Sequence, residues 1–226
     1  MKTKRLLVVA LGSVLILLVA VIFLVTNKGK NGNNPSPDVR QETDGETETE
    51  EPTMDPFLTG NSISQEWLPV NEYSRPGTAL TEVNAIVIHY VGNPGTTAAQ
   101  NRDYFASLAE TGETSASSHF IIGLSGEIIQ CIPLTEIAYA SNQRNGDTIS
   151  IECCHPDEDG HFTAETYQSL VILTAALCRS YGLDAQTGVI RHYDVTQKKC
   201  PLYYVEHEDA WLTFLADIQA RIRLSE

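Results

Sequence analysis

The segment Ala85-Ile86-Val87-Ile88-His89-Tyr90 leads, through Val91, into the turn sequence Gly92-Asn93-Pro94-Gly95. A short run rich in β-branched residues is typical of a buried strand, which we predict over residues 83–90. The glycines and the proline end that strand, and the residues after them predict a helix over about 98–108. His89 is therefore expected at the C-terminal end of a strand that enters the core.

Strand and helix patterns continue to alternate downstream. Residues 117–123 and 127–132 flank Leu124-Ser125-Gly126 and predict a hairpin. Residues 148–154 alternate polar and apolar side chains, as a strand with two unlike faces does. Thr163 and Gly182 are the expected caps of a helix with one apolar stripe, and a strand over 188–192 and an amphipathic helix over 208–223 follow it. The pattern contains no internal repeat and predicts an α/β domain, with a mixed sheet flanked by helices.

The N-terminal region carries an apolar run. Residues 6–25 are interrupted only by Gly12 and Ser13, and three basic residues precede them. A bilayer core needs about twenty such residues, whereas the apolar part of a cleavable signal runs about seven to fifteen. We therefore predict a signal-anchor transmembrane helix with a cytoplasmic N-terminus, and everything after it outside the cell. The alternative is a long signal peptide that is removed on secretion.

Composition divides the chain into three regions. Residues 1–26 hold the basic stub and the apolar helix, and residues 27–63 have the Gly, Asn, Pro, Thr and Glu content of a disordered acidic linker. Residues 64–226 are long enough for one folded catalytic domain. The formal net charge of −14 argues against nucleic acid as a partner. We expect a monomer.

Cysteines and lysines both draw attention to Cys200. Its two preceding residues, Lys198 and Lys199, are the only lysines of the predicted domain. Five cysteines in an exported chain leave at least one unpaired, which suits Cys200 as a metal-binding thiolate. The other four are expected to be small buried side chains, although a disulfide from Cys131 to Cys153 or Cys154 remains an alternative; the set is Cys131, Cys153, Cys154 and Cys178.

Three residues have the chemistry of a catalytic zinc site. His89 ends one predicted strand, His192 ends another, and Cys200 follows eight residues later. Two imidazoles and one thiolate are three of the four ligands of tetrahedral zinc, and a catalytic zinc keeps its fourth position for water. Each residue alone is a weak signal, because a histidine at a strand end is more often a satisfied polar residue than a ligand. Their combination predicts one Zn²⁺ ion and a hydrolase.

Four ordered motifs carry a family resemblance. They are Ile86-Val87-Ile88-His89-Tyr90, Ser117-Ser118-His119-Phe120-Ile121-Ile122 with Ser125-Gly126-Glu127-Ile128-Ile129-Gln130, Ile149-Ser150-Ile151-Glu152, and His192-Tyr193-Asp194-Val195 through Lys198-Lys199-Cys200-Pro201. With these motifs the chain from about residue 67 to 223 resembles the zinc-dependent N-acetylmuramoyl-L-alanine amidases of type 2, a family that includes the animal peptidoglycan recognition proteins.

The resemblance implies a reaction and a role for each residue. His89, His192 and Cys200 would bind zinc, which lowers the pKa of bound water toward about 7. Glu152 would take a proton from that water and return it to the leaving nitrogen. Lys198, in preference to Lys199, would stabilise negative charge on the carbonyl oxygen. The implied substrate is peptidoglycan, cut between N-acetylmuramic acid and L-alanine, and the implied location is the outer side of a bacterial cell membrane.

The sequence also departs from the family. Ser118 stands where some members have a tyrosine near the metal, so Glu152 would have to fill that role. Ala138-Tyr139-Ala140-Ser141 lacks the histidine of the Ala-Trp/Tyr-His sequence in many bacterial members. We expect His119 to be structural. The remaining histidines lie near acidic or turn residues and are predicted at the surface; they are His155, His161 and His207.

Three other functions compete with zinc-dependent hydrolysis. Some relatives bind peptidoglycan without cutting it, although a pure binder has no need of an open metal site. The chain could instead be a thiol enzyme in which His192 activates Cys200. Lys198 would then lower the pKa of the Cys200 thiol. The zinc could also be purely structural, but structural sites usually have four protein ligands. Glu152 by its alternation alone suits a solvent-facing strand and a cleft equally well.

Overall fold

A computed structural model describes residues 54–60 and 62–224 of the chain. The predicted membrane segment, residues 6–25, lies outside these residues, as does most of the predicted linker. None of the helices in the described ranges is long and apolar enough to cross a membrane.

The domain is built on one mixed sheet, as predicted. Its six strands lie in the order β1-β4-β3-β5-β2-β6, and all neighbouring pairs are parallel except the antiparallel hairpin of β3 and β4. Strands β5 and β2 are central, so both have neighbours on each side. The bounds are β1 Ile63–Gln65, β2 Ala85–Tyr90, β3 Phe120–Ile122, β4 Ile128–Gln130, β5 Thr148–Cys153 and β6 Val189–Arg191.

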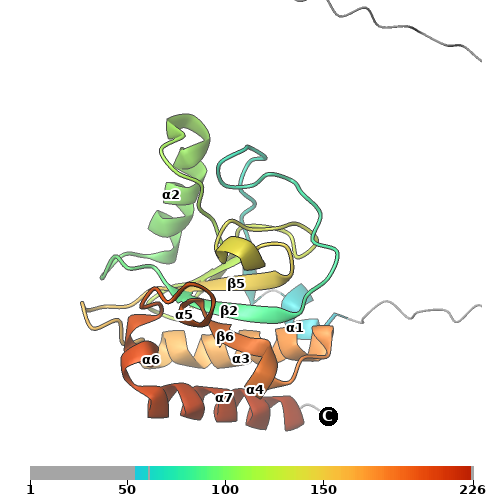
Figure 1. The fold of residues 1–226 in the computed structure, drawn as a ribbon, viewed down its shortest axis with the longest axis vertical. Helices are drawn as coiled ribbons and strands as arrows, with labels where there is room; N and C mark the ends of the chain where they lie inside the picture. Colours follow the sequence, from blue (N-terminus) through green and yellow to red (C-terminus); the bar gives the residue numbers. More distant parts are fainter. Residues whose placement is uncertain (1–53, 61, 225–226) are drawn as a thin grey trace, which may run out of the picture. The chain divides into compact units, whose positions relative to one another are not determined.

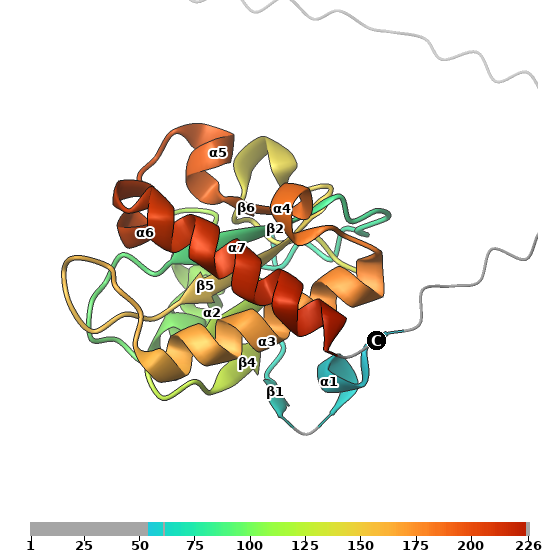
Figure 2. The same cartoon turned by 90° about the horizontal axis from the view of Figure 1, so that it is seen from below.

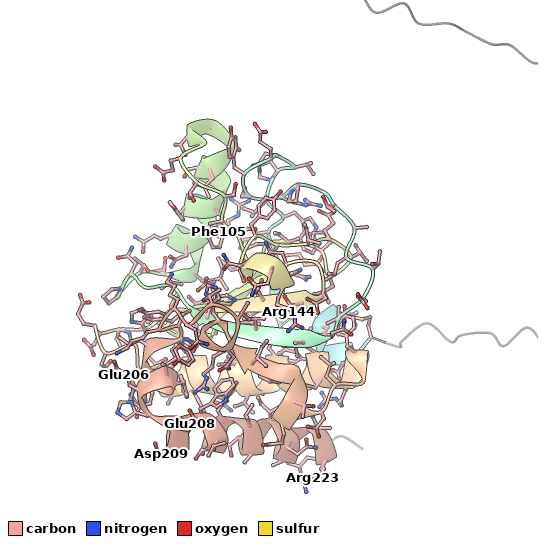
Figure 3. The ribbon with its side chains drawn as sticks, in the orientation of Figure 1. Phe105, Arg144, Glu206, Glu208, Asp209 and Arg223 are labelled. Atoms are coloured by element: carbon pink, nitrogen blue, oxygen red, sulfur yellow. The ribbon has the colours of Figure 1, made fainter. Side chains whose placement is uncertain are left out.

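Helices cover both faces of the sheet (Figure 1). Helix α2 lies on one face and α3 on the other, and α7 packs against α3 on the side of the domain away from α2 (Figure 2). Figure 3 shows Phe105 on the side of α2 that faces the sheet, and Asp209 and Arg223 at opposite ends of α7. The helical segments are α1 Pro56–Thr59, α2 Ala98–Thr111, α3 Ala164–Tyr181, α4 Ala185–Gly188, α5 His192–Thr196, α6 Leu202–Glu206 and α7 Glu208–Arg223, with a 3₁₀ turn, η1, at Asn142–Arg144.

The caps of α3 are those expected from the sequence. The Thr163 hydroxyl accepts from the Thr166 backbone N–H, which satisfies one of the free donors of the first turn. Gly182 ends the helix at a φ of 64°, a left-handed conformation that glycine adopts without steric cost. Helix α2 runs to Thr111, beyond its predicted end near residue 108, because Gly112 (φ 60°) supplies the left-handed cap.

The β3–β4 hairpin is fixed against the start of α3. The Thr163 hydroxyl donates to the Leu124 carbonyl at 2.8 Å, and the Ser169 hydroxyl donates to the Gly126 carbonyl at 2.7 Å. A side chain at Gly126 would put its Cβ 2.8 Å from the Glu165 carbonyl oxygen, and φ there is +81°. The turn therefore requires glycine both for its backbone conformation and for its close approach to α3.

Strand β5 has the two unlike faces expected from its alternation, and both of them are buried. Ile149 and Ile151 belong to the core under α3 and α7, and Ser150 on the opposite face is only 1% exposed. Because β5 is a central strand with cover on both sides, its polar residues face other buried polar groups instead of solvent. The Ser118 hydroxyl, for example, donates to the Ser150 carbonyl at 2.9 Å.

Packed structure begins ahead of residue 64, where the folded domain was expected to start. Asp55 caps α1 and forms an ion pair with Arg179 of α3 at 2.6 Å. Leu58 of α1 is 5% exposed and belongs to the core. These few residues of the expected linker are therefore part of the fold.

All five cysteines are free and buried, so the alternative of a Cys131 disulfide is not realised. Burial raises the pKa of Cys131, Cys154 and Cys178 to about 12 each. These three, with Cys153, pack as small apolar side chains, as predicted.

Candidate metal centre and catalytic cleft

The candidate site lies where three parallel strands end. His89 of β2 is the register partner of Glu152 of β5, so both side chains share one face of the sheet. Strand β6 ends at Arg191, and His192 opens α5 directly after it. Ligand sites in open α/β sheets form at this carboxyl edge, because the connecting segments there leave room for them.

The loop after α5 brings Cys200 back to His192. Gln197 ends α5 with a φ of 65°, which reverses the chain direction. The Tyr193 N–H then donates to the Cys200 carbonyl at 2.9 Å and closes the loop. The eight-residue spacing seen in the sequence is thus the length of one short helix and its return.

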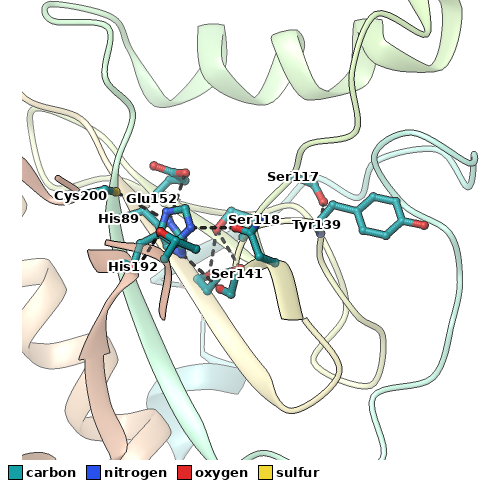
Figure 4. Close-up of polar contacts among 12 residues, drawn as sticks. His89, Ser117, Ser118, Tyr139, Ser141, Glu152, His192 and Cys200 are labelled. Carbon is teal, nitrogen blue, oxygen red and sulfur yellow. Dashed lines mark hydrogen bonds and ion pairs between the residues drawn. The ribbon is translucent and has the colours of Figure 1, made fainter. Parts of the chain in front are cut away.

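His89, His192 and Cys200 converge as predicted. One ligand atom from each lies within 4.8 Å of the other two, and all three side chains are buried. The Cys200 Sγ is 3.9 Å from His89 Nδ1, and the two imidazole ring centres are 4.6 Å apart (Figure 4). Zinc bonds of about 2.0–2.3 Å would place such atoms somewhat closer together, at about 3.3–3.6 Å. The donor set and spacing therefore fit a zinc ion after small side-chain adjustments.

The outer nitrogen of each histidine has a partner on the turn η1. His192 Nε2 is 3.0 Å from Asn142 Oδ1, and His89 Nε2 is 3.4 Å from the Ser141 hydroxyl. The Nδ1 atoms are left to face the metal position. Neither partner is predictable from the sequence, because nothing local in Ser141-Asn142 distinguishes these residues from an ordinary polar turn.

Glu152 lies in the cleft and not on a solvent face. Its Oε1 is 3.9 Å from His89 Nδ1, and its Oε2 is buried without a hydrogen-bond partner among the described residues. Burial raises the pKa of Glu152 to about 8, and the positive charge of Lys198 opposes this shift. A bound cation would act in the same direction as Lys198 and lower the pKa of Glu152. This carboxyl group is therefore suited to exchange protons near neutral pH.

The two neighbouring lysines have different surroundings. Lys198 lines the same cleft of about 520 Å³ as His89, His192, Cys200 and Glu152. Lys199 instead forms an exposed ion pair with Glu206, with its Nζ 2.7 Å from Oε1. Lys198 therefore lines the cleft, and its catalytic role stays a prediction.

Ser118 and His119 lie outside the metal cluster. The Ser118 side chain is fully buried and bonded to Ser150, so it does not replace the tyrosine of other family members. His119 is buried, with Nε2 2.9 Å from the Glu136 carbonyl and Nδ1 accepting from the Ser150 N–H at 3.0 Å. His119 therefore has the structural role that we expected.

His155 is not a surface histidine, in contrast to the prediction. Its side chain is 1% exposed, its Nδ1 lies 2.8 Å from the Asp157 carbonyl, and its ring packs against Tyr90. The contact with Tyr90 joins residues that lie 65 positions apart, which sequence composition alone does not reveal. His161 and His207 are exposed as predicted, and both rings pack against Tyr203.

Comparison with known proteins identifies the family. The sequence model of the family described as N-acetylmuramoyl-L-alanine amidase, amidase type 2, matches residues 79–202, more than half of the chain. The chain belongs to this family. All of the predicted site residues lie within the matched segment of this amidase domain.

Two curated relatives agree with that assignment. N-acetylmuramoyl-L-alanine amidase BlyA of Bacillus subtilis (strain 168) is 31% identical over 180 residues, which cover 71% of this chain and 47% of that protein. N-acetylmuramoyl-L-alanine amidase CwlL of Bacillus licheniformis is 35% identical over 165 residues, covering 67% and 45%. The amidase-family chain thus spans about half the length of the curated relatives it matches.

Solved structures share the amidase fold. The catalytic domain of XlyA superposes with a TM-score of 0.57 at 29% identity, covering 69% of this chain and 98% of that domain. A mutant endolysin from Bacillus subtilis gives the same TM-score and identity, and covers 69% and 97%. The similarity therefore extends over nearly the whole of each known domain.

Proposed function

We propose that this chain is a peptidoglycan hydrolase that cleaves the amide between N-acetylmuramic acid and the L-alanine of the stem peptide. The observation that carries the proposal is the convergence of His89, His192 and Cys200 beside Glu152, in one cleft of an amidase-family domain. Family membership supports the bond that is cut, and the cleft supports hydrolysis.

The three converging side chains would hold the zinc ion through Nδ1 of each histidine and the sulfur of Cys200. When bound, zinc supplies a Lewis acid that polarises a carbonyl group and lowers the pKa of water. The group that meets this spacing in the described part of the chain has only three members, which leaves a position for substrate or solvent, as in catalytic sites.

Glu152 and Lys198 would perform the proton transfer and the charge stabilisation. The buried carboxylate of Glu152 takes a proton from the attacking water and returns it to the leaving nitrogen of L-alanine. Lys198 reaches the cleft from its exposed loop and stabilises the negative charge that develops on the carbonyl oxygen. Lys199 has no part in this, because Glu206 holds it outside the cleft.

A thiol mechanism is less well supported. Burial raises the pKa of the Cys200 thiol to about 12, and the negative charge of Glu152 acts in the same direction. Nucleophilic thiols have a lowered pKa instead. A bound cation deprotonates a coordinating thiol outright, so the surroundings of Cys200 suit a metal ligand better than a nucleophile.

The location of the enzyme is part of the same proposal. A transmembrane helix at residues 6–25 would hold the domain at the outer face of a bacterial membrane, with secretion after cleavage as the alternative. An insoluble wall polymer is a suitable substrate for a tethered enzyme, since the linker keeps the local concentration high. Release of the protein from membranes by detergent, but not by salt, would support the anchor.

The test is mass spectrometry of peptidoglycan fragments treated with the purified full-length protein, with and without zinc. Cleavage at the proposed bond frees stem peptides that begin with L-alanine. Glu152→Gln is expected to lose at least about a hundredfold in rate while it keeps its zinc, and Lys199→Ala serves as the matched control with unchanged activity.

Other outcomes identify the rival functions. A zinc-loaded protein that binds the wall but releases no stem peptide would be a binding module. Activity that survives chelation but is lost on alkylation would indicate a thiol enzyme. Full activity in Glu152→Gln would remove this residue from the mechanism.

A further inference from the structure

Two adjacent residues each contact one histidine of the metal site, at the ring nitrogen that faces away from the metal position. Asn142 Oδ1 lies 3.0 Å from His192 Nε2, and the Ser141 hydroxyl lies 3.4 Å from His89 Nε2. His89 and His192 come from different strands, yet one turn reaches the outer nitrogen of each ring. Figure 4 shows Ser141 beside the His89 and His192 rings, on the side away from Cys200.

The turn that carries these residues is held firmly in place. Asn145 Oδ1 accepts from the backbone N–H groups of Ala140, at 3.2 Å, and Ser141, at 2.6 Å. The Gln143 side chain donates to the Val195 carbonyl at 3.0 Å, which ties the turn to α5, the helix that begins with His192. The turn and the ligand-bearing helix therefore form one hydrogen-bonded unit.

Asn142 has an unusual backbone conformation. Its φ is +51°, in the left-handed region, where asparagine and glycine are tolerated far better than other residues. This conformation begins η1 and aims the amide oxygen at His192. Left-handed residues outside glycine are uncommon and concentrate at functional sites, where the surrounding structure holds them.

The chemistry of the contact fixes the state of the ring. A side-chain amide oxygen can only accept a hydrogen bond, so the nitrogen it faces must carry the proton. A neutral imidazole protonated at Nε2 presents the lone pair of Nδ1, which is the nitrogen that faces the metal position. The Ser141 hydroxyl can donate or accept, and its contact is longer, so its hold on His89 is weaker.

We propose that Asn142 and Ser141 are positioning residues that fix the tautomer and the ring orientation of both histidine ligands from a single turn. The inference rests on the zinc site of the proposed function. Partners of this kind outside the ligand shell raise metal affinity by about 10- to 100-fold. Asn142 is expected to supply most of the effect, because its bond is the shorter one and its acceptor role is unambiguous.

The test compares two substitutions that keep the backbone conformation. Asn142→Gly accepts a φ of +51° but removes the acceptor, and Asn142→Asp retains both an acceptor and some tolerance of that φ. The dissociation constant for zinc is measured on the full-length protein by competition with a chromogenic chelator. We expect Asn142→Gly to bind zinc about 10- to 100-fold more weakly and Asn142→Asp to stay within about threefold of the wild type.

Asn84→Ala is the matched control, because it removes an exposed asparagine side chain that bonds to Asp147 and touches neither histidine nor the residues of the turn. Its zinc affinity is expected to stay near that of the wild type. Ser141→Ala is the second variant. It is expected to weaken zinc binding by about three- to tenfold, less than the loss expected for Asn142→Gly, because the Ser141 contact with His89 is longer.

A second readout does not depend on metal or on activity. Long-range proton–nitrogen NMR of the histidine rings reports the tautomer in the metal-free protein. The wild type is expected to show His192 protonated at Nε2, and Asn142→Gly is expected to show a mixture of tautomers. Unchanged zinc affinity together with an unchanged tautomer in Asn142→Gly would overturn the inference.

The two proposals can fail separately. A wild-type protein that binds zinc with the expected tautomer but releases no stem peptide would contradict the proposed function and leave the positioning role intact. Normal peptidoglycan cleavage by the wild type, with a zinc affinity and a His192 tautomer that Asn142→Gly does not change, would contradict only the positioning role.

Discussion

Replacing His119 by glutamine tests how strongly the fold requires a neutral histidine in its core. The Ser150 N–H donates to His119 Nδ1, so the ring must carry its proton on Nε2, where it donates to the Glu136 carbonyl. A second proton on the ring would have to go to Nδ1, where it would face the Ser150 N–H, which is also a donor. Glutamine keeps a donor and an acceptor in similar positions but cannot titrate.

The magnitude follows from the change in pKa. Burial lowers the pKa of His119 from 6.5 to about 4, although the hydrogen bond to Glu136 and the negative charge of Glu136 oppose this shift. The folded protein therefore binds fewer protons than the unfolded chain between these values, and stability is lost as the pH falls below 6.5. Each pH unit in this window costs about 1.4 kcal/mol, which gives a loss of about 2 kcal/mol between pH 7 and pH 5.

The assay is urea unfolding of the wild type and His119→Gln at pH 7, 6 and 5. Titration of the other groups, including His89 and His192, cancels when the two proteins are compared at each pH. As the pH falls from 7 to 5, the free energy of unfolding of the wild type is expected to fall more steeply than that of His119→Gln. The difference between the two proteins should therefore change by about 2 kcal/mol over this range. A difference between the proteins that is independent of pH would refute the argument that burial keeps this ring neutral.

Three further predictions concern stability. Gly126→Ala should reduce the free energy of unfolding by more than about 2 kcal/mol, because the added Cβ meets the backbone of α3. Gly182→Ala has a similar positive φ but open space around the added Cβ, and should reduce the free energy of unfolding by about 1 kcal/mol. Equal losses in urea unfolding would contradict the close approach of Gly126 to α3. Leu170→Ala should cost about 2–5 kcal/mol in the same assay, since this side chain is fully buried under the sheet, and a loss below about 1 kcal/mol would indicate a loosely packed core. Arg75→Met should cost about 1–2 kcal/mol at pH 7. Because the hydrogen bond from Arg75 holds the pKa of Glu136 below its usual 4.5, this cost should shrink as the pH falls through that lowered value, and a cost that stays constant to pH 3 would exclude the ion pair as its source.

Local patterns in the sequence predicted most of the elements of this fold. The alternation and capping signals around residues 163–182 are properties of neighbouring residues, so the bounds of α3 could be inferred from them. The hairpin of β3 and β4 and the closing helix α7 were found in the same way. The ligand set His89, His192 and Cys200 was also accessible, because the residue types and the spacing carry the chemistry of zinc.

The tertiary structure alone decided which polar residues are buried and what they contact. Ser150, on an alternating strand, and His155, ahead of an acidic segment, are both buried, because β5 is central in the sheet and the His155 ring packs against Tyr90. Asn142 and Ser141 meet histidines 50 and 52 residues away in the chain. A sequence by itself determines periodicity, caps and the chemistry of its side chains, whereas contacts over such separations depend on strand order and on packing from both sides of the sheet, which no local pattern encodes.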